Sequence, residues 1–269
     1  MNRKILLVRA NELRHKALSI VIKNSGHEVY EIIDTKKVQK EIITNNSIKL
    51  HFQSRNQVEF DFFSDLVCIE KFKKSHQIEC WDINSDEAIE FAKKMDVELI
   101  ITFGCSIIKK PWLEQFNNRI LGIHLGLSPY YRGSGTNFFP FVNNELGAVG
   151  YTLMNLNEGI DTGNIIHQSY AKMIYGDSIH TVGTRLMRKM FNDIAEITHL
   201  EKLSHEFDSA LKQPTDKEFR FYRKRDFDSV SLELALKNIN NKSILNFLED
   251  IDLERKRFPL VREIDINAT

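Results

Sequence analysis

Short apolar runs alternate with helix-patterned segments over the first two hundred residues, and this alternation restricts the possible folds more than any other feature of the chain. Residues 5–8 form an apolar run, residues 12–23 carry apolar residues at helical spacing, and residues 29–33 form the next run. Strands and helices that alternate in this way predict an α/β fold whose mostly parallel sheet has helices on both faces.

The alternation is interrupted once and then ends. Between about residues 34 and 75 the pattern blurs into Lys, Asn and Gln, and we interpret this stretch as an insertion with structure of its own. Regularity returns at Ser85, a good N-cap for a helix over 86–94, and a strand is predicted over 99–103. A long helix is predicted over about 178–199, and the polar stretch around Pro214 predicts a linker. We therefore expect a catalytic domain over 1–205 and a small C-terminal appendage over 206–269.

Composition narrows the class of protein. There are 37 basic and 37 acidic residues, so net charge gives no reason to expect a nucleic-acid or membrane partner. The three cysteines show no CxxC pairing, which favours a reducing compartment and argues against a structural metal site. The N-terminal apolar run is too short for a signal peptide or a membrane span. We expect a cytoplasmic protein that acts on a small molecule.

Two segments place titratable side chains where strands end. In ILGIHLGLSPYYRG (120–133), His124 stands where an apolar strand over 120–124 gives way to a loop, and ligands of α/β sheets bind beyond such carboxyl ends. In NEGIDTGNII (157–166), two glycines flank Asp161 after a strand over 149–156. Each residue alone has an ordinary explanation, a histidine hydrogen-bonded to backbone and an aspartate that forms a turn.

Together the two segments resemble those of the N-formyltransferases that use 10-formyltetrahydrofolate, which carry N-x-H-x-S-x-L-P-x-x-R-G and a later T-x-x-x-x-x-x-x-G-x-D-x-G. The matching residues are His124, Pro129, Arg132 and Gly133, then Thr152, Gly159, Asp161 and Gly163. The resemblance covers about residues 1–200 and implies a Rossmann-like fold. It departs at the family's asparagine, which is Gly122 here, and at its serine, which is Gly126.

The resemblance implies that His124 and Asp161 are catalytic. In formyl transfer an uncharged amine attacks the formyl carbon, a tetrahedral oxyanion forms, and protons move between the two nitrogens. A histidine can carry those protons while a carboxylate orients its ring and stabilises its cation. In the family the asparagine helps to hold the oxyanion, an effect of roughly 3 kcal/mol for comparable donors. Gly122 cannot do so, which leaves open whether a backbone N–H or an ordered water substitutes, or whether the reaction differs.

The resemblance also implies contacts to both substrates. The co-substrate 10-formyltetrahydrofolate is expected to lie against Phe103, Gly104, Cys105, Ser106, Ile107, Ile108 and Gly159, although a helix-entry turn is an equal alternative for 104–108. The acceptor is expected to lie against Gly122, Tyr130, Tyr131, Arg132 and Asn137, with a packing role for the two tyrosines as the alternative. No metal is expected.

The acceptor is narrowed by exclusion. RANELRH, after the first strand, lacks the glycine-rich loop with which the glycinamide ribonucleotide enzymes hold phosphate, and the appendage is shorter than the basic C-terminal domain of the initiator-tRNA enzymes. RGSGTNFFPFVNNE (132–145) instead resembles a series in the amino-sugar formyltransferases, so we expect a nucleotide-linked amino sugar or a related small amine. A homodimer is left open.

Two other functions and one basic cluster stay as alternatives. Water could replace the amine, which would make the chain a hydrolase that releases formate from 10-formyltetrahydrofolate, or the chain could be an inactive folate- or nucleotide-binding protein. RFYRKR (220–225) could bind phosphate or RNA, but a solvated strand edge is the favoured interpretation for a short cluster in a neutral protein.

Overall fold

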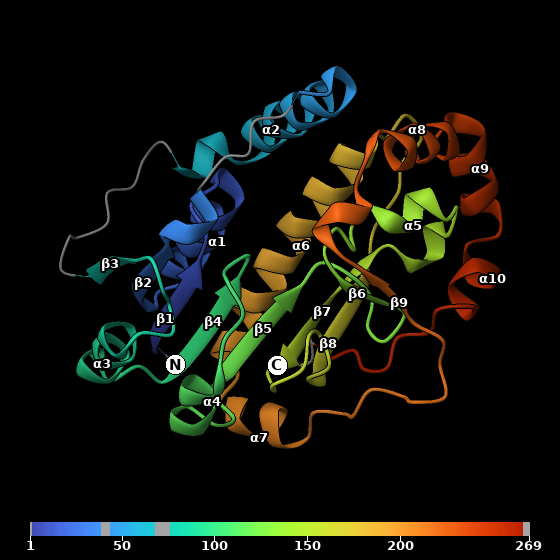
Figure 1. Cartoon of the computed structure of the whole chain (residues 1–269). Helices are drawn as coiled ribbons and strands as arrows, with labels where there is room; N and C mark the ends of the chain where they lie inside the picture. Colours follow the sequence, from blue (N-terminus) through green and yellow to red (C-terminus); the bar gives the residue numbers. More distant parts are fainter. Residues whose placement is uncertain (1, 39–43, 68–75, 266–269) are drawn as a thin grey trace.

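A seven-stranded sheet forms the centre of the molecule (Figure 1). The computed structural model describes residues 2–38, 44–67 and 76–265. The strand order is β3-β2-β1-β4-β5-β7-β8, and the first five of these run parallel. Strand β7 runs antiparallel to β5, strand β8 runs antiparallel to β7, and the two extend the sheet beyond β5. The strands are β1 (Lys4–Arg9), β2 (Glu28–Asp34), β3 (Gln77–Cys80), β4 (Leu99–Phe103), β5 (Ile120–His124), β7 (Gly150–Asn155) and β8 (Asn164–Tyr170).

Helices cover both faces of the sheet, as the sequence predicted. One face packs against α1 (Leu13–Asn24), α2 (Asn46–Val67) and α6 (Ile179–His199), and the other against α3 (Asp86–Met95) and α4 (Lys110–Gln115). Neighbouring side chains of β1 divide between the two cores, because Ile5 and Leu7 join the first and Leu6 and Val8 join the second. The strand is therefore apolar at consecutive positions.

Two predicted helix starts are found with their caps. The Ser85 hydroxyl accepts a hydrogen bond from the backbone N–H of Ala88 at the start of α3. Ser178 does the same for Thr181 at the start of α6. Both caps satisfy backbone donors that a helix start leaves without an intrahelical partner.

The predicted insertion contributes a long helix to the first face. Helix α2 packs against α1 and α6, and its fully buried Phe63 lies 5.5 Å from Phe191 between ring centroids. Residues 39–43 and 68–75 of this insertion lie outside the described residues.

The C-terminal residues pack onto the sheet and its loops. A short strand after the long helix, β9 (Arg220–Tyr222), pairs with β6 (Tyr131–Gly133), so a second, two-stranded sheet joins the two parts of the chain. Phe247 and Phe258 belong to the same core as the sheet, and the division at residue 205 stays a prediction. Over the described part of the chain, no helix is long and apolar enough to cross a membrane. The remaining elements are η1 (Thr35–Val38), β6 (Tyr131–Gly133), α5 (Phe139–Val142), η3 (Leu146–Ala148), α7 (Leu203–Asp208), β9 (Arg220–Tyr222), η4 (Lys224–Asp226), α8 (Ser229–Asn238), α9 (Asn241–Glu249) and α10 (Ile251–Lys256).

Strand β9 includes part of the basic cluster. Arg220 forms an ion pair with Glu145, with 2.7 Å between Nη2 and Oε1, and the hydrogen bonds to Glu145 raise the pKa of Arg220. This arginine therefore has a carboxylate partner within the protein.

Candidate active site

His124 lies at the carboxyl end of β5 and is almost fully buried. Its Nε2 lies 2.8 Å from the carbonyl oxygen of Tyr131. A carbonyl oxygen only accepts hydrogen bonds, so Nε2 carries the hydrogen. The other ring nitrogen, Nδ1, lies 3.3 Å from Oδ1 of Asp161. Nδ1 is therefore the nitrogen that can take up and release a proton, and a carboxylate lies beside it.

Asp161 reaches His124 from the turn between β7 and β8. Its backbone is left-handed, with φ of 54°, and its Oδ2 accepts a hydrogen bond of 2.7 Å from the backbone N–H of Gly133. One carboxylate oxygen thus faces the imidazole while the other is held by the main chain. The structure brings together the two residues that the motifs singled out.

A cleft of about 160 Å³ opens beside this pair. On one side lie His124 and Asp161, which we name the acid–base wall, and on another lies the loop 104–108 after β4, which we name the loop wall. All of the residues predicted to contact folate line the cleft except Phe103, which is buried against His15. Lining residues that the sequence did not indicate include Thr102, Met154, Leu156 and Asn157.

Side chains from other parts of the chain hold the loop wall through its backbone. The fully buried carboxylate of Asp34 accepts a hydrogen bond of 2.6 Å from the backbone N–H of Ser106. Asn84 accepts from the N–H of Lys109 at 2.8 Å and donates to the carbonyl of Ile107 at 3.1 Å. Neither Asp34 nor Asn84 lies in the segments that the sequence singled out. Asp34 did carry a usable signal, because it ends a buried strand as His124 does.

Gly104 allows the loop wall to lie close to α1. Its φ of 66° is left-handed, and an added Cβ would come within 2.3 Å of Nε2 of His15. Any larger residue would therefore displace both the loop and the imidazole. Burial lowers the pKa of His15 to about 4, so this ring is neutral at pH 7. Burial also raises the pKa of Cys105 to about 12, so the cysteine of this wall remains a thiol.

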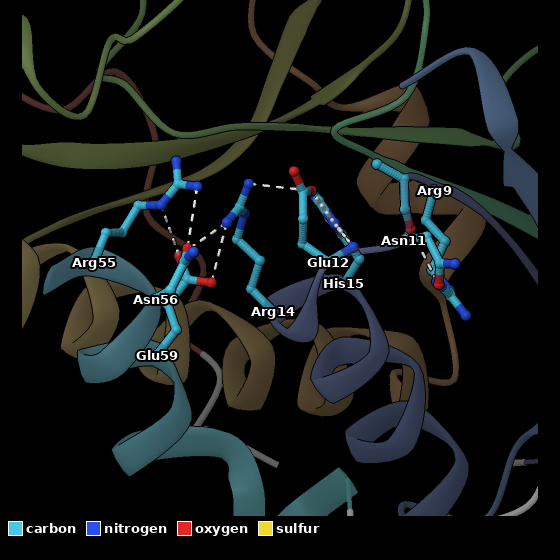
Figure 2. Close-up of polar contacts among 9 residues, drawn as sticks. Arg9, Asn11, Glu12, Arg14, His15, Arg55, Asn56 and Glu59 are labelled. Atoms are coloured by element: carbon cyan, nitrogen blue, oxygen red, sulfur yellow. Dashed lines mark hydrogen bonds and ion pairs between the residues drawn. The ribbon is translucent and has the colours of Figure 1, made fainter. Parts of the chain in front are cut away.

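A row of charged side chains ties the start of α1 to α2. Figure 2 shows Arg14 between Glu12 and Glu59, with Arg55 on the other side of Glu59. Arg14 lies 2.8 Å from Glu59 and 3.2 Å from Glu12, between guanidinium nitrogen and carboxylate oxygen. Burial alone would raise the pKa of Glu12, but its hydrogen bond with His15 and the charge of Arg14 lower it to about 2. The two cations thus have two carboxylates as partners, and the network fixes the helix next to the loop wall.

The glycines on either side of His124 make room for side chains. A Cβ on Gly122 would come within 2.2 Å of Leu156 Cδ2, so the leucine occupies the space that the family's asparagine would enter. A Cβ on Gly126 would come within 2.6 Å of the Nε2 atom of His124. Neighbouring side chains thus leave no room for a side chain at either glycine, and the apolar side chain of Leu156 lies where the family's amide would be.

Most residues predicted to bind the acceptor point elsewhere than into this cleft. Tyr131 is fully buried and its hydroxyl donates to Glu145, while Tyr130 donates to the carbonyl of Pro259 at 3.0 Å. Arg132 donates to Gln213 at 2.8 Å. The side chain of Asn137 lies against Gly183, where an added Cβ would come within 2.7 Å of its Nδ2. Gly122 alone of the predicted set lines the cleft. The tyrosines have the packing role that the sequence left open, and acceptor contacts remain a prediction.

The chain is similar in sequence to known formyltransferases. The family model described as formyl transferase matches residues 19–196. A methionyl-tRNA formyltransferase from Finegoldia magna is 25% identical over 138 residues, which cover 48% of this chain and 44% of that protein. The chain spans about half the length of the curated relatives it matches first.

Two solved structures show the same fold. A sugar N-formyltransferase from a Shewanella species matches with a TM-score of 0.52 and 17% identity, over 88% of this chain and 87% of that one. An N-formyltransferase from Helicobacter canadensis, in complex with folinic acid and dTDP-3-aminofucose, matches with a TM-score of 0.52 and 18% identity, over 88% of this chain and 80% of that one.

Proposed function

The chain belongs to the formyl transferase family, and from this premise we propose that it transfers the formyl group of 10-formyltetrahydrofolate to the amine of a small acceptor. The observation that supports this most is the acid–base wall, where Nδ1 of His124 lies 3.3 Å from Asp161 at the side of a cleft. In this proposal the backbone of the loop wall receives the pterin ring, because its N–H and carbonyl groups suit a heterocycle with donors and acceptors.

The acid–base wall then moves the protons of the reaction. The acceptor amine attacks the formyl carbon, and a C–N bond forms as the carbonyl becomes an oxyanion. Nδ1 of His124 takes a proton from the new ammonium nitrogen and delivers it to the folate nitrogen as that C–N bond breaks. Asp161 stabilises the imidazolium between the two transfers, and the cation offsets the charge of the oxyanion. Atoms and charges balance without an oxidant or a metal.

We propose a nucleotide-linked amino sugar as the acceptor. The Helicobacter canadensis protein, which has this fold, holds dTDP-3-aminofucose, and segment 132–145 resembles the corresponding segment of amino-sugar enzymes. The methionyl-tRNA enzymes among the relatives make tRNA the competing acceptor. The neutral net charge favours the sugar, because proteins that bind nucleic acid usually carry a basic surface.

Free Cys80 and Cys105 support a reducing, cytoplasmic location for the protein.

An acceptor screen tests the proposed function. The protein is incubated with 10-formyltetrahydrofolate and, separately, with dTDP- and UDP-linked amino sugars, methionyl-tRNA and glycinamide ribonucleotide, and each product is examined for the mass of one added formyl group. We expect formylation of a nucleotide-linked amino sugar that His124→Ala abolishes. Formylated methionyl-tRNA would overturn the acceptor class. Formate released without any acceptor would identify a hydrolase, and folate binding without either product would identify a binding protein.

A further inference from the structure

We propose that Gln213 is a positioning residue that holds Asp161 against His124. The proposal rests on the proposed function, since it gives Gln213 a part in that reaction. The side-chain Nε2 of Gln213 donates to the backbone carbonyl of Asp161 at 2.8 Å and to that of Gly163 at 2.9 Å. One amide group therefore fixes the main chain on both sides of residue 162.

Gln213 comes to this turn from a different part of the chain. Residues 209–213 follow α7, and the backbones of Leu211 and Ile165 exchange two hydrogen bonds of 2.7 and 2.9 Å. This bridge sets the segment beside the start of β8, so that Gln213 faces the turn that precedes the strand. The segment lies outside residues 19–196, which the family model matches.

The turn needs such support. Asp161 has a left-handed backbone, which is strained for a residue other than glycine. Ile160 next to it is 44% exposed and offers little packing. The hydrogen bond from Gly133 holds the carboxylate itself, while Gln213 holds the backbone that carries it.

The orientation of the Gln213 amide is fixed by the partner of its oxygen atom. Its Oε1 accepts a hydrogen bond of 2.8 Å from Nη2 of Arg132, whose guanidinium lies over the ring of Phe219 at 4.6 Å. The oxygen thus faces a cation and the NH₂ group faces two carbonyls, and a reversed amide would place oxygen against oxygen. Methionine has the size of glutamine without these donors and acceptors, so Gln213→Met removes the hydrogen bonds and keeps the volume.

A double-mutant cycle with Asp161 separates positioning from a general structural role. We expect Gln213→Met to lower kcat roughly 10- to 100-fold, as misplacement by about 1 Å does, with the KM for 10-formyltetrahydrofolate within about twofold. In the Asp161→Asn background the same change should lower kcat by less than about twofold, because the carboxylate it positions is already gone. An equal loss in both backgrounds, or wild-type kcat in Gln213→Met, would overturn the proposal.

Asn238→Leu is the matched control. Asn238 also donates from one amide nitrogen to two backbone carbonyls, those of Phe141 at 3.0 Å and Val142 at 2.9 Å, and it does not line the cleft. We expect it to lower the melting temperature about as much as Gln213→Met does, with kcat within about twofold of wild type. An equal loss of kcat in both variants would show that Gln213 acts through stability alone.

A crystal structure of Gln213→Met tests whether Gln213 positions the Asp161 carboxylate, and it needs no acceptor. We expect the Asp161 carboxylate to lie beyond hydrogen-bond reach of Nδ1 of His124, against 3.3 Å in the wild type. A carboxylate that stays in place would overturn the positioning role. If the acceptor screen finds no formylated product, the proposed function fails, but this comparison of structures still tests Gln213.

Discussion

The two walls of the cleft are built in opposite ways. The loop wall is held by its main chain, through the buried side chain of Asp34 and the partly exposed side chain of Asn84. The acid–base wall presents side chains, and main-chain groups hold them, the carbonyl of Tyr131 for His124 and the N–H of Gly133 for Asp161. A ligand that touches both walls therefore meets two supports that share few residues. We expect donor binding and turnover to respond separately to substitution.

The largest effect is expected in the acid–base wall. His124→Ala and Asp161→Asn should each lower kcat by about 10²- to 10⁴-fold, because proton transfer loses its carrier or its orienting charge. Affinity for tetrahydrofolate, measured by calorimetry, should stay within about twofold, because the loop wall is untouched. A parallel fall in folate affinity would show that the walls are not independent.

A smaller effect, on binding of the folate donor and not on turnover, is expected from substitutions in the loop wall. Asp34→Asn keeps the shape of the side chain but replaces one acceptor oxygen by an NH₂ group, so either Ser106 N–H or Lys36 N–H loses its partner. Such a loss costs about 1–3 kcal/mol, and we expect the KM for the folate donor to rise roughly 5- to 50-fold with kcat within about threefold. Steady-state kinetics at varied donor concentration measures both. Asn84→Ala, on the more exposed side, should act in the same direction and less strongly.

Gly122 lines the cleft and tests how tightly the cleft is packed. Gly122→Asn must displace Leu156, which we expect to cost about 1–3 kcal/mol of stability and to lower the rate of formyl transfer several-fold. The double variant with Leu156→Ala should recover part of the melting temperature, because the collision is removed. A Gly122→Asn variant that is faster than wild type at unchanged melting temperature would show that Leu156 can move aside without loss of stability.

The smallest effect is expected from acidification, through His15 behind the loop wall. The pKa of His15 is lowered by burial from 6.5 to about 4, so between these values the unfolded chain binds a proton that the folded chain does not. The free energy of unfolding therefore decreases as the pH falls from 6.5 towards 4, by about 2 kcal/mol at pH 5 for this group.

The measurement is the melting temperature at pH 7 and pH 5 for wild type and His15→Gln. The decrease should be smaller in the variant, although His27, His51 and His180 act in the same direction, because burial lowers the pKa of each to about 4. Equal decreases in the two proteins would contradict the assignment to His15.

The sequence predicted the sheet because strand and helix patterns are local. It singled out His124 and Asp161 because the two motifs contain them. It could not pair the supporting residues with the residues that they hold, since Asp34 meets Ser106 across 72 positions and Gln213 meets Asp161 across 52. The first pair forms only when β2 and β4 come together in the sheet, and the second only when the segment after α7 packs beside β8. The same reason applies to Leu156, whose side chain fills the space over Gly122 from a neighbouring strand end.

The bridge between Leu211 and Ile165 also has a consequence during protein synthesis. All seven strands of the main sheet and both residues of the acid–base wall have left the ribosome before Gln213 does, since the sheet ends at Tyr170. Domains fold largely from the N-terminus as the chain emerges. A nascent chain that has made its sheet therefore still lacks the amide that holds the Asp161 turn, and the pair of His124 and Asp161 acquires its full support only after α6 and α7 have been translated.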